Sequence, residues 1–250
     1  MVFACDPFTL PLNNEQMFVF DMTFRGHILP CHPETLLPVL RQENGTWVPD
    51  ARMPLPVLIG EENENVRTVG FLGDSITQGI GSGGPDNAFP LLVQRELGPA
   101  YAVWNLGIGY ARAADAATDG FWLHRAKQCD IVTVCLGVND ICQDFPSETI
   151  CGNLKKTVLA LRENGCAVCL LTPPPFDYAG KQRAVWEDVC YYIEDELSRF
   201  VRAVVKTHPF LSVSPAEPWK AKYGAHPDAN GHRLLAGSIA AVLSGEAFRA

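Results

Sequence analysis

The sequence predicts an α/β fold in which a parallel sheet is covered by helices on both faces. From residue 66 onward, short apolar runs alternate regularly with longer segments of helical character. This alternation is typical of a parallel sheet whose strands are joined by crossover helices. The first 65 residues read differently, because they combine short strand-like runs with turn signals and lack helical periodicity. We therefore predict a small β-rich lobe over residues 1–65 and an α/β domain over residues 66–250.

The elements of the predicted α/β domain follow one another in a simple order. Its strands are apolar, often β-branched runs, and we expect them at residues 68–72, 102–105, 131–136, 167–171 and 203–205. Its helices are expected at residues 88–97, 111–126, 147–164, 181–200 and 229–243. Three consecutive prolines at 173–175 end the fourth strand, because proline cannot donate a hydrogen bond to a neighbouring strand. Ser147 begins a helix well, and Asn164 with Gly165 ends it.

In the amino-terminal lobe, residues 17–24 resemble a strand, Asn44 and Gly45 give a turn signal, and residues 49–56 are rich in proline. Short strands and turns of this kind indicate β structure. The segment is short for a complete jelly roll, so the alternative is a few strands packed against the main sheet.

The composition excludes several classes of protein. With 47% apolar and 19% charged residues, the 250-residue chain is long and apolar enough to bury a full core. A net charge of −8 and a pI near 5.2 argue against nucleic acid as a partner. No apolar stretch approaches the length of a membrane span, and the amino terminus lacks the features of a signal peptide.

Nine cysteines occur, an odd number without the spacing of a disulfide scaffold. Cys166 and Cys169 have the spacing of a redox motif, but residues three apart on a strand point to opposite faces. We interpret them as buried free thiols. Reduced thiols and the lack of an export signal indicate a cytoplasmic protein.

The residues 73–79, Gly-Asp-Ser-Ile-Thr-Gln-Gly, are the most informative stretch of the chain. They follow the first predicted strand directly, so Ser75 lies on a tight turn with its hydroxyl exposed. That position suits a nucleophile. Serine is a weak nucleophile by itself, so the motif gains meaning only from a base and an oxyanion site elsewhere. The alternative is a serine that only forms the turn or caps a helix.

Three further motifs supply these partners. Residues 105–110, Asn-Leu-Gly-Ile-Gly-Tyr, follow the second strand, and residues 137–140, Gly-Val-Asn-Asp, follow the third. His226 and Pro227 precede the last helix. Carboxyl ends of parallel strands meet at one edge of the sheet, where ligands bind. Together the four motifs resemble those of the SGNH or GDSL-type hydrolases, a family of esterases and lipases, over roughly residues 66–243.

The resemblance implies a flavodoxin-like three-layer α/β/α fold and a serine hydrolase that needs no metal or organic cofactor. Ser75 would attack an ester carbonyl, and His226 would take its proton and return it to the leaving alcohol. The oxyanion hole would comprise the backbone N–H of Ser75, a backbone N–H at Gly109 or Tyr110, and the side-chain amide of Asn139. His232 is a rival base, although its place inside the last helix favours a structural hydrogen bond.

The sequence departs from the family pattern at two positions. Tyr110 stands where a glycine is usual, so either it shapes the acyl pocket or Gly109 donates instead. Tyr223 stands where the family has an aspartate that orients the histidine. A main-chain carbonyl or Glu217 could orient His226, whereas Asp228 is expected to cap the last helix.

The predicted activity is hydrolysis of small acyl esters, with acetyl esters of a carbohydrate or a similar alcohol favoured by analogy with the family. Two alternatives stay open: an acyltransferase or thioesterase that uses the same site, and a non-catalytic member that binds a glycan or a protein partner. Trp122, Trp186 and Trp219 could stack on sugar rings if exposed, but Trp122 and Trp186 could equally belong to the core.

Overall fold

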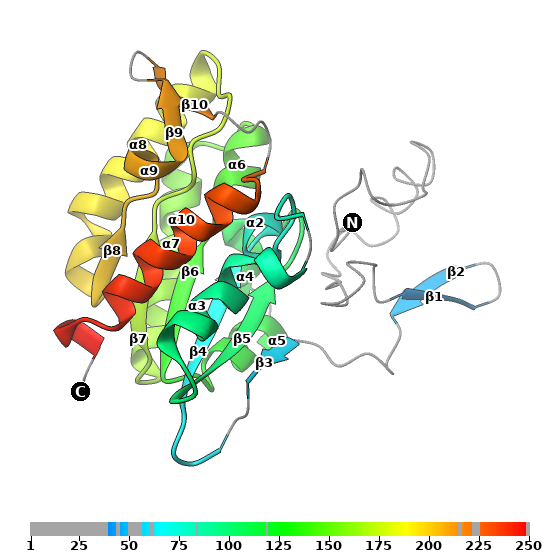
Figure 1. The fold of residues 1–250 in the computed structure, drawn as a ribbon. Coiled ribbons are helices and arrows are strands. Elements are labelled where there is room, and N and C mark those ends of the chain that lie inside the picture. The colour runs from blue at the N-terminus through cyan, green and yellow to red at the C-terminus, as the bar shows by residue number, and fades with distance from the viewer. Residues whose placement is uncertain are drawn as a thin grey trace.

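The computed structural model of the protein describes residues 40–43, 46–49, 57–60, 63–83, 85–118, 120–214, 217–221 and 226–248. Its centre is a six-stranded sheet with the order β3-β5-β4-β6-β7-β8 (Figure 1). The strands are β3 (Val57–Ile59), β4 (Arg67–Gly73), β5 (Tyr101–Gly107), β6 (Ile131–Cys135), β7 (Ala167–Leu171) and β8 (Ala203–Val205).

Five of the six strands, β4 to β8, pair in parallel, and β3 adds to β5 in the antiparallel direction. In chain order the parallel strands run 2-1-3-4-5, which is the flavodoxin-like arrangement. The predicted fold class is therefore confirmed. The chain places β5 on one side of β4 and then crosses over to place β6 on the other side. Ligands of such sheets bind in the crevice between these two neighbouring strands, β4 and β6, outside their carboxyl ends.

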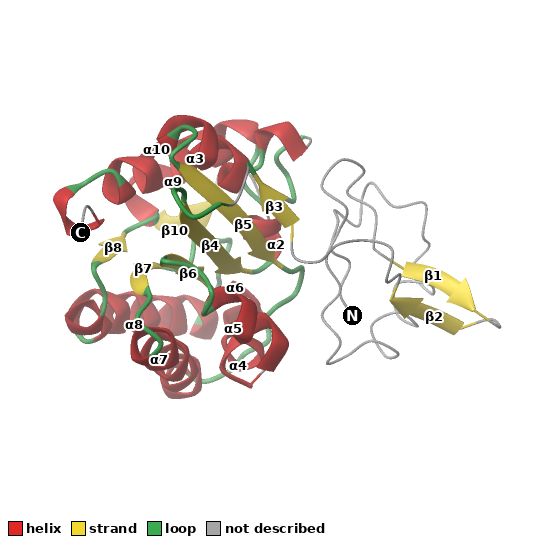
Figure 2. Ribbon diagram, turned by 90° about the horizontal axis from the view of Figure 1, so that it is seen from below, coloured by secondary structure: helices red, strands yellow, loops and turns green. Residues whose placement is uncertain are grey.

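Helices cover both faces of the sheet (Figure 2). On one face lie α3 (Phe89–Leu97) and α10 (Ala229–Leu243), and on the other lie α4 (Ala113–Thr118), α5 (Gly120–Ala126), α7 (Ser147–Glu163) and α8 (Lys181–Asp195). Three short helices, α2 (Ser75–Gln78), α6 (Val138–Cys142) and α9 (His208–Leu211), follow β4, β6 and β8. No helix in the described part of the chain is long and apolar enough to span a membrane.

Shorter elements complete the described chain. Single 3-10 turns are η1 (Pro85–Asn87), η2 (Leu197–Phe200) and η3 (Glu246–Phe248). Two antiparallel pairs lie outside the main sheet, β1 (Leu40–Glu43) with β2 (Thr46–Pro49), and β9 (Ser212–Ser214) with β10 (Glu217–Ala221).

The sheet separates two hydrophobic cores. Along β6, Val132 and Val134 belong to the core under α7 and α8, whereas Ile131 and Cys135 belong to the core under α3 and α10. Successive side chains of a strand point to opposite faces, so a strand covered on both sides must be apolar throughout. Cys166 and Cys169 fall into different cores as free, buried thiols, which confirms the prediction for this pair.

The helix expected over 111–126 corresponds to α4 and α5, and residue 119 between them lies outside the described residues. Another predicted helix is wrong in extent. The helix expected over 181–200 ends at Asp195, and the 3-10 turn η2 follows. The lobe predicted for residues 1–65, including the strand expected at 17–24, lies largely outside the described residues. Its division from the domain stays a prediction, although β3 belongs to the main sheet.

Two glycines let the short helix α2 sit directly on the ends of β4 and β5. A Cβ atom on Gly73 would lie 1.9 Å from Oγ1 of Thr77, and one on Gly107 would lie 2.1 Å from the backbone nitrogen of Gln78. Real atoms cannot approach so closely, so any larger residue would push α2 away from the sheet. The position of Ser75 therefore depends on these two residues.

Candidate active site

Ser75 is the first residue of α2, immediately after the carboxyl end of β4. Asp74 precedes the helix, and its Oδ1 accepts a hydrogen bond from the backbone N–H of Ile76 at 2.9 Å. This cap fixes the turn that carries the serine. The tight turn predicted at Ser75 leads directly into a helix. At the first position of a helix, the N–H of Ser75 has no acceptor within the helix.

His226 lies beside Ser75 although 151 residues separate the two in the chain. The Nε2 atom of His226 is 2.9 Å from the Oγ atom of Ser75, and both residues are partly exposed. A neutral imidazole whose Nε2 carries no proton accepts the hydroxyl hydrogen in this geometry. The structure thus brings the predicted nucleophile and the predicted base into direct contact.

The glycine-rich loop after α2 packs against the histidine. Gly81 has a φ angle of +87°, and a Cβ atom added there would lie 2.7 Å from Cβ of His226 and 2.5 Å from the carbonyl oxygen of Pro227. Only a glycine permits both this backbone conformation and this approach. The loop therefore packs directly against His226 and limits where its side chain can lie.

His232 sits one turn into α10 and is fully buried. Its Nδ1 accepts a hydrogen bond from the backbone N–H of Phe89 at 3.2 Å, so its proton lies on Nε2, which is 3.2 Å from the carbonyl oxygen of Ile80. The ring also stacks on that of Phe89. Burial lowers the pKa of His232 to about 4, which keeps the imidazole neutral. As expected from its place in the helix, His232 makes structural hydrogen bonds.

Asn139 lies in α6, directly after β6, and reaches the loop that follows β5. Its Nδ2 donates a hydrogen bond of 2.9 Å to the carbonyl oxygen of Ala111. The same loop is held to the nucleophile turn, because the N–H of Ile108 donates to the carbonyl oxygen of Gly73 at 3.0 Å. The second and third sequence motifs therefore meet beside Ser75, at the edge of the sheet that the fold predicts.

Tyr110 has a φ angle of +61°, in the left-handed region that favours glycine. A side chain in this region costs about 1–2 kcal/mol relative to glycine. The side chain of Tyr110 is 45% exposed, so it does not fill the core. The choice between Gly109 and Tyr110 as the backbone donor stays open.

Two buried carboxyl groups beside the site were not singled out by the sequence reasoning. Asp140 is 2% exposed and its Oδ2 accepts from the N–H of Ala113 at 3.0 Å; burial raises the pKa of this group to about 6. Asp74 is fully buried, its Oδ2 has no hydrogen-bond partner among the described residues, and burial raises the pKa of Asp74 to about 7. An aspartate one residue before a helix start is the signal that could have identified Asp74 as a cap.

The remaining predicted residues have mixed outcomes. Asp228 caps α10 as expected, since its Oδ1 accepts from the N–H of Gly231 at 2.9 Å. Trp186 is buried and donates to the carbonyl oxygen of Pro173, so it belongs to the core and does not stack on a sugar. Tyr223 and the side chains of Glu217, Trp122 and Trp219 lie outside the described residues, and the group that orients His226 stays a prediction. Within the described ranges, no group of three or more His, Cys, Asp or Glu could hold a metal ion.

Several solved structures share this fold. TesA is 22% identical with a TM-score of 0.58, covering 71% of this chain and 98% of that one. A mutant of Axe2, an acetyl-xylooligosaccharide esterase from Geobacillus stearmophilus, is 19% identical with a TM-score of 0.54, covering 74% and 97%. A carbohydrate esterase of family 3 from Talaromyces cellulolyticus is 19% identical with a TM-score of 0.53, covering 72% and 97%. The TM-scores show a shared fold, and at these low identities they show the fold alone.

No curated protein sequence matches the chain significantly. Residues 71–234 match the model of a family described as GDSL-like lipase/acylhydrolase. The matched region begins within β4, ends within α10, and contains all four motifs around Ser75 and His226. Because it spans more than half of the sequence, the chain belongs to the GDSL-like lipase/acylhydrolase family of ester-bond hydrolases.

Proposed function

We propose that the protein hydrolyses small acyl esters through an acyl-enzyme intermediate on Ser75. The observation that carries this proposal is the 2.9 Å separation between Oγ of Ser75 and Nε2 of His226 at the carboxyl edge of a parallel sheet. A serine in contact with a neutral imidazole is the arrangement that generates an alkoxide-like nucleophile near neutral pH.

In the first half of the reaction, Oγ of Ser75 bonds to the ester carbonyl carbon while its proton passes to Nε2 of His226. The carbonyl π electrons move to the oxygen, which becomes the oxyanion of a tetrahedral intermediate. Collapse of that intermediate breaks the bond to the alcohol oxygen, and His226 gives its proton to the departing alcohol. In the second half, water replaces the alcohol, attacks the acyl-serine with the help of His226, and releases the carboxylic acid.

The oxyanion would be held by the N–H of Ser75, by a backbone N–H at Gly109 or Tyr110, and by the side-chain amide of Asn139. Support comes from position: Ser75 begins a helix, and the loop after β5 is tied to Gly73 beside it. Asn139 uses one of its amide hydrogens on Ala111, and its second one has no partner among the described residues. Each such donor typically contributes about 3 kcal/mol to stabilisation of the transition state.

We propose that the substrate is an ester of a small acyl group, and acetyl esters of carbohydrates are the preferred candidates. Two of the structural relatives carry names that describe esterases of acetylated xylooligosaccharides or of carbohydrates. This substrate class is an analogy, since the fold itself does not select a substrate.

The proposal is tested with p-nitrophenyl acetate, butyrate and octanoate and with acetylated xylooligosaccharides, for the wild type, Ser75→Ala and His226→Ala. Ser198→Ala is the matched control, because Ser198 bonds only its own helix end near the amino edge of β8. We expect both active-site variants to lose nearly all turnover, the control to keep it, and acetate to be the best of the three p-nitrophenyl esters. A fluorophosphonate probe should label Ser75 alone.

Equal rates for the wild type and Ser75→Ala would reject the serine mechanism and favour a binding role for this fold. A preference for octanoate would reject the small acyl group. If an added alcohol competes with water for the acyl group, the protein is an acyltransferase that uses the same site, and the proposal of hydrolysis is rejected.

A further inference from the structure

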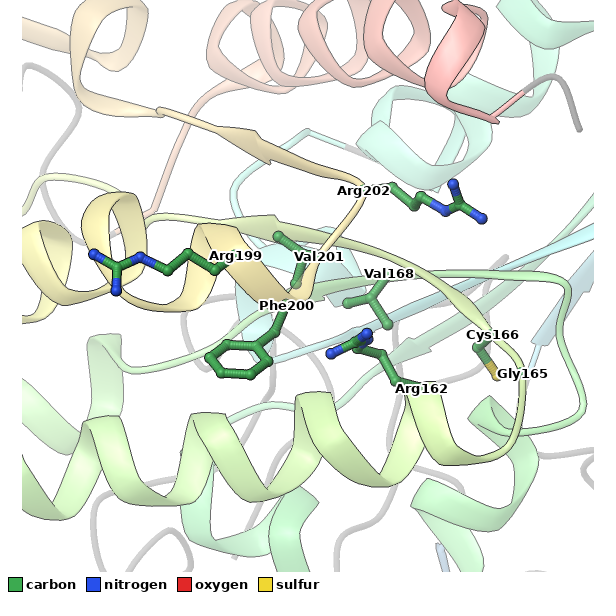
Figure 3. A pocket seen from close by; sticks show the side chains of 8 residues that line it. All are labelled: Arg162, Gly165, Cys166, Val168, Arg199, Phe200, Val201 and Arg202. Carbon is green, nitrogen blue, oxygen red and sulfur yellow. The ribbon is translucent and has the colours of Figure 1, made fainter.

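A second candidate site lies at the opposite edge of the sheet from Ser75. A surface pocket of about 350 Å³ is lined by Arg162, Val168, Arg199, Phe200, Val201 and Arg202, among others (Figure 3). Arg162 lies near the end of α7, and Arg199 to Arg202 lie in and after η2, just before β8 begins. Because β4, β7 and β8 are parallel, residues before β8 and residues after β4 are at opposite ends of the strands. We call this hollow the arginine pocket.

The arginine pocket concentrates positive charge on a chain whose net charge is −8. Arg162, Arg199 and Arg202 line it, and Lys155 lies next to it, since its Nζ is 5.5 Å from the centre of the Phe200 ring. The guanidinium of Arg162 approaches the same ring at 5.7 Å. Like charges placed close together repel one another, so a bound anion would relieve the repulsion.

Two of these arginines lack an anionic partner. Arg199 pairs with Asp195 at 3.5 Å and with Glu196 at 3.6 Å, and in Figure 3 its side chain points away from the other two. By contrast, the guanidinium groups of Arg162 and Arg202 have no ion pair or hydrogen bond with any described residue. In Figure 3 the side chain of Val168 lies between them. Arginine forks bind carboxylate and phosphate oxygens in pairs, so these two present unused donors to an anion.

The lining and the size narrow the class of ligand. Phe200 and Val201 are partly exposed, so apolar surface lies beside the charged groups, whereas Val168 is buried. A volume of about 350 Å³ is at the small end of the range for pockets that hold metabolites. We propose that the arginine pocket binds a small organic anion, a phosphate ester or a carboxylate, with its charged group on the guanidinium groups of Arg162 and Arg202 and its apolar part on Phe200 and Val201.

The test uses phenyl phosphate and sodium benzoate as probes, with benzyl alcohol as the neutral analogue, at low ionic strength. Amide chemical shifts of the ¹⁵N-labelled full chain report where each probe binds. We expect saturable shifts at residues 165–168 and 200–202 with one or both anions and none with benzyl alcohol. Adding salt should weaken the binding, since the attraction is electrostatic.

Variants separate a built site from general attraction to positive charge. R162Q/R202Q removes both unpaired forks, and we expect affinity to fall by at least about tenfold, because each charge-assisted pair is lost. R95Q/R183Q removes the same amount of charge from two exposed, ion-paired arginines elsewhere and should leave affinity within about twofold. R162K/R202K keeps the charge but not the fork and should fall between the two. Thermal unfolding of each variant shows whether it is folded.

Three results would overturn the proposal: the absence of saturable shifts with both anions, equal losses in R162Q/R202Q and R95Q/R183Q, or shifts confined to the loops around Ser75. None of these readings depends on ester hydrolysis. An inactive enzyme that still binds the anions would leave this site standing and remove only the proposed esterase function.

Discussion

His226 and His232 lie six residues apart and serve opposite purposes. His226 is partly exposed and its Nε2 faces the hydroxyl of Ser75. His232 is fully buried, and both of its ring nitrogens are engaged by backbone groups, the N–H of Phe89 and the carbonyl oxygen of Ile80. The same side chain is therefore placed for proton transfer in one position and for holding the backbone in the other.

The glycine-rich loop connects the two histidines. His232 holds the carbonyl of Ile80, and the next residue, Gly81, packs against His226. The two histidines show what identifies a candidate base: its side chain is at least partly exposed, and one of its ring nitrogens faces a reactive group. Nearness in sequence to the His226-Pro227 motif does not identify one. The contrast also suggests that the buried histidine supports the exposed one through the loop between them.

The largest expected effect is on His226. Replacing it with glutamine removes the group that accepts the proton of Ser75, and we expect kcat for a p-nitrophenyl ester to fall by about 10⁴-fold. Unfolding by urea should show little change in stability, because the side chain is partly exposed. If His226→Gln were as active as the wild type, or if His232→Gln lost activity equally without losing stability, the division of roles would be wrong.

His232→Gln should instead lower stability, by about 2–4 kcal/mol at pH 7, because a buried ring and its two hydrogen bonds are lost. Its pH dependence sharpens the test. Since the folded pKa of His232 is about 4, below the ordinary 6.5, the unfolded chain binds the proton more readily between these values. The wild type should thus lose about 3 kcal/mol of stability as the pH falls from 6.5 to 4.

Urea unfolding of both proteins from pH 4 to 8 measures this effect. The glutamine variant should show a shallower loss of stability over the same acidic range. Parallel pH profiles for the two proteins would mean that His232 is not the titrating group.

Gly81→Ala and Gly83→Ala form a matched pair that tests the link through the loop. Both glycines have positive φ angles, +87° and +79°, so alanine brings similar backbone strain to each. Only at Gly81 does the new Cβ collide with His226 and Pro227; at Gly83 no described atom lies within 4 Å. We expect Gly81→Ala to lower kcat by about 100-fold through displacement of the histidine.

Gly83→Ala should show the common loss of stability and retain most of its turnover. Equal activity of the two variants in the p-nitrophenyl acetate assay would show that contact with Gly81 does not position His226.

The smallest effect is expected at Tyr110, the exposed residue that holds a left-handed conformation beside the site. Tyr110→Gly should relieve this strain and raise stability by about 0.5–1 kcal/mol, after the greater flexibility of glycine in the unfolded chain is subtracted. Urea unfolding measures the change. A loss of stability would mean that contacts of the tyrosine ring outweigh the backbone strain. The surroundings of His226 would then be no more strained than those of His232.

Much of the fold could be predicted because its signals are local. The strands at 167–171 and 203–205 and the last helix at 229–243 begin and end where the apolar pattern places them. The strand β3 was missed because a three-residue edge strand is defined by its partner β5. The short helix α6 depends on Gly137 with a φ angle of +116°, which the sequence does not specify.

The sequence by itself determined the order of strands and helices and the candidate residues Ser75, Asn139 and His226, since periodicity and motifs are properties of neighbouring residues. Only the tertiary structure decided that Ser75 and His226 are 2.9 Å apart, that His232 is bound to Phe89 and Ile80, and that two unpaired arginines line a pocket at the far edge of the sheet. These contacts join residues up to 152 positions apart. They depend on how the helices pack on the sheet, which no local pattern of residues contains.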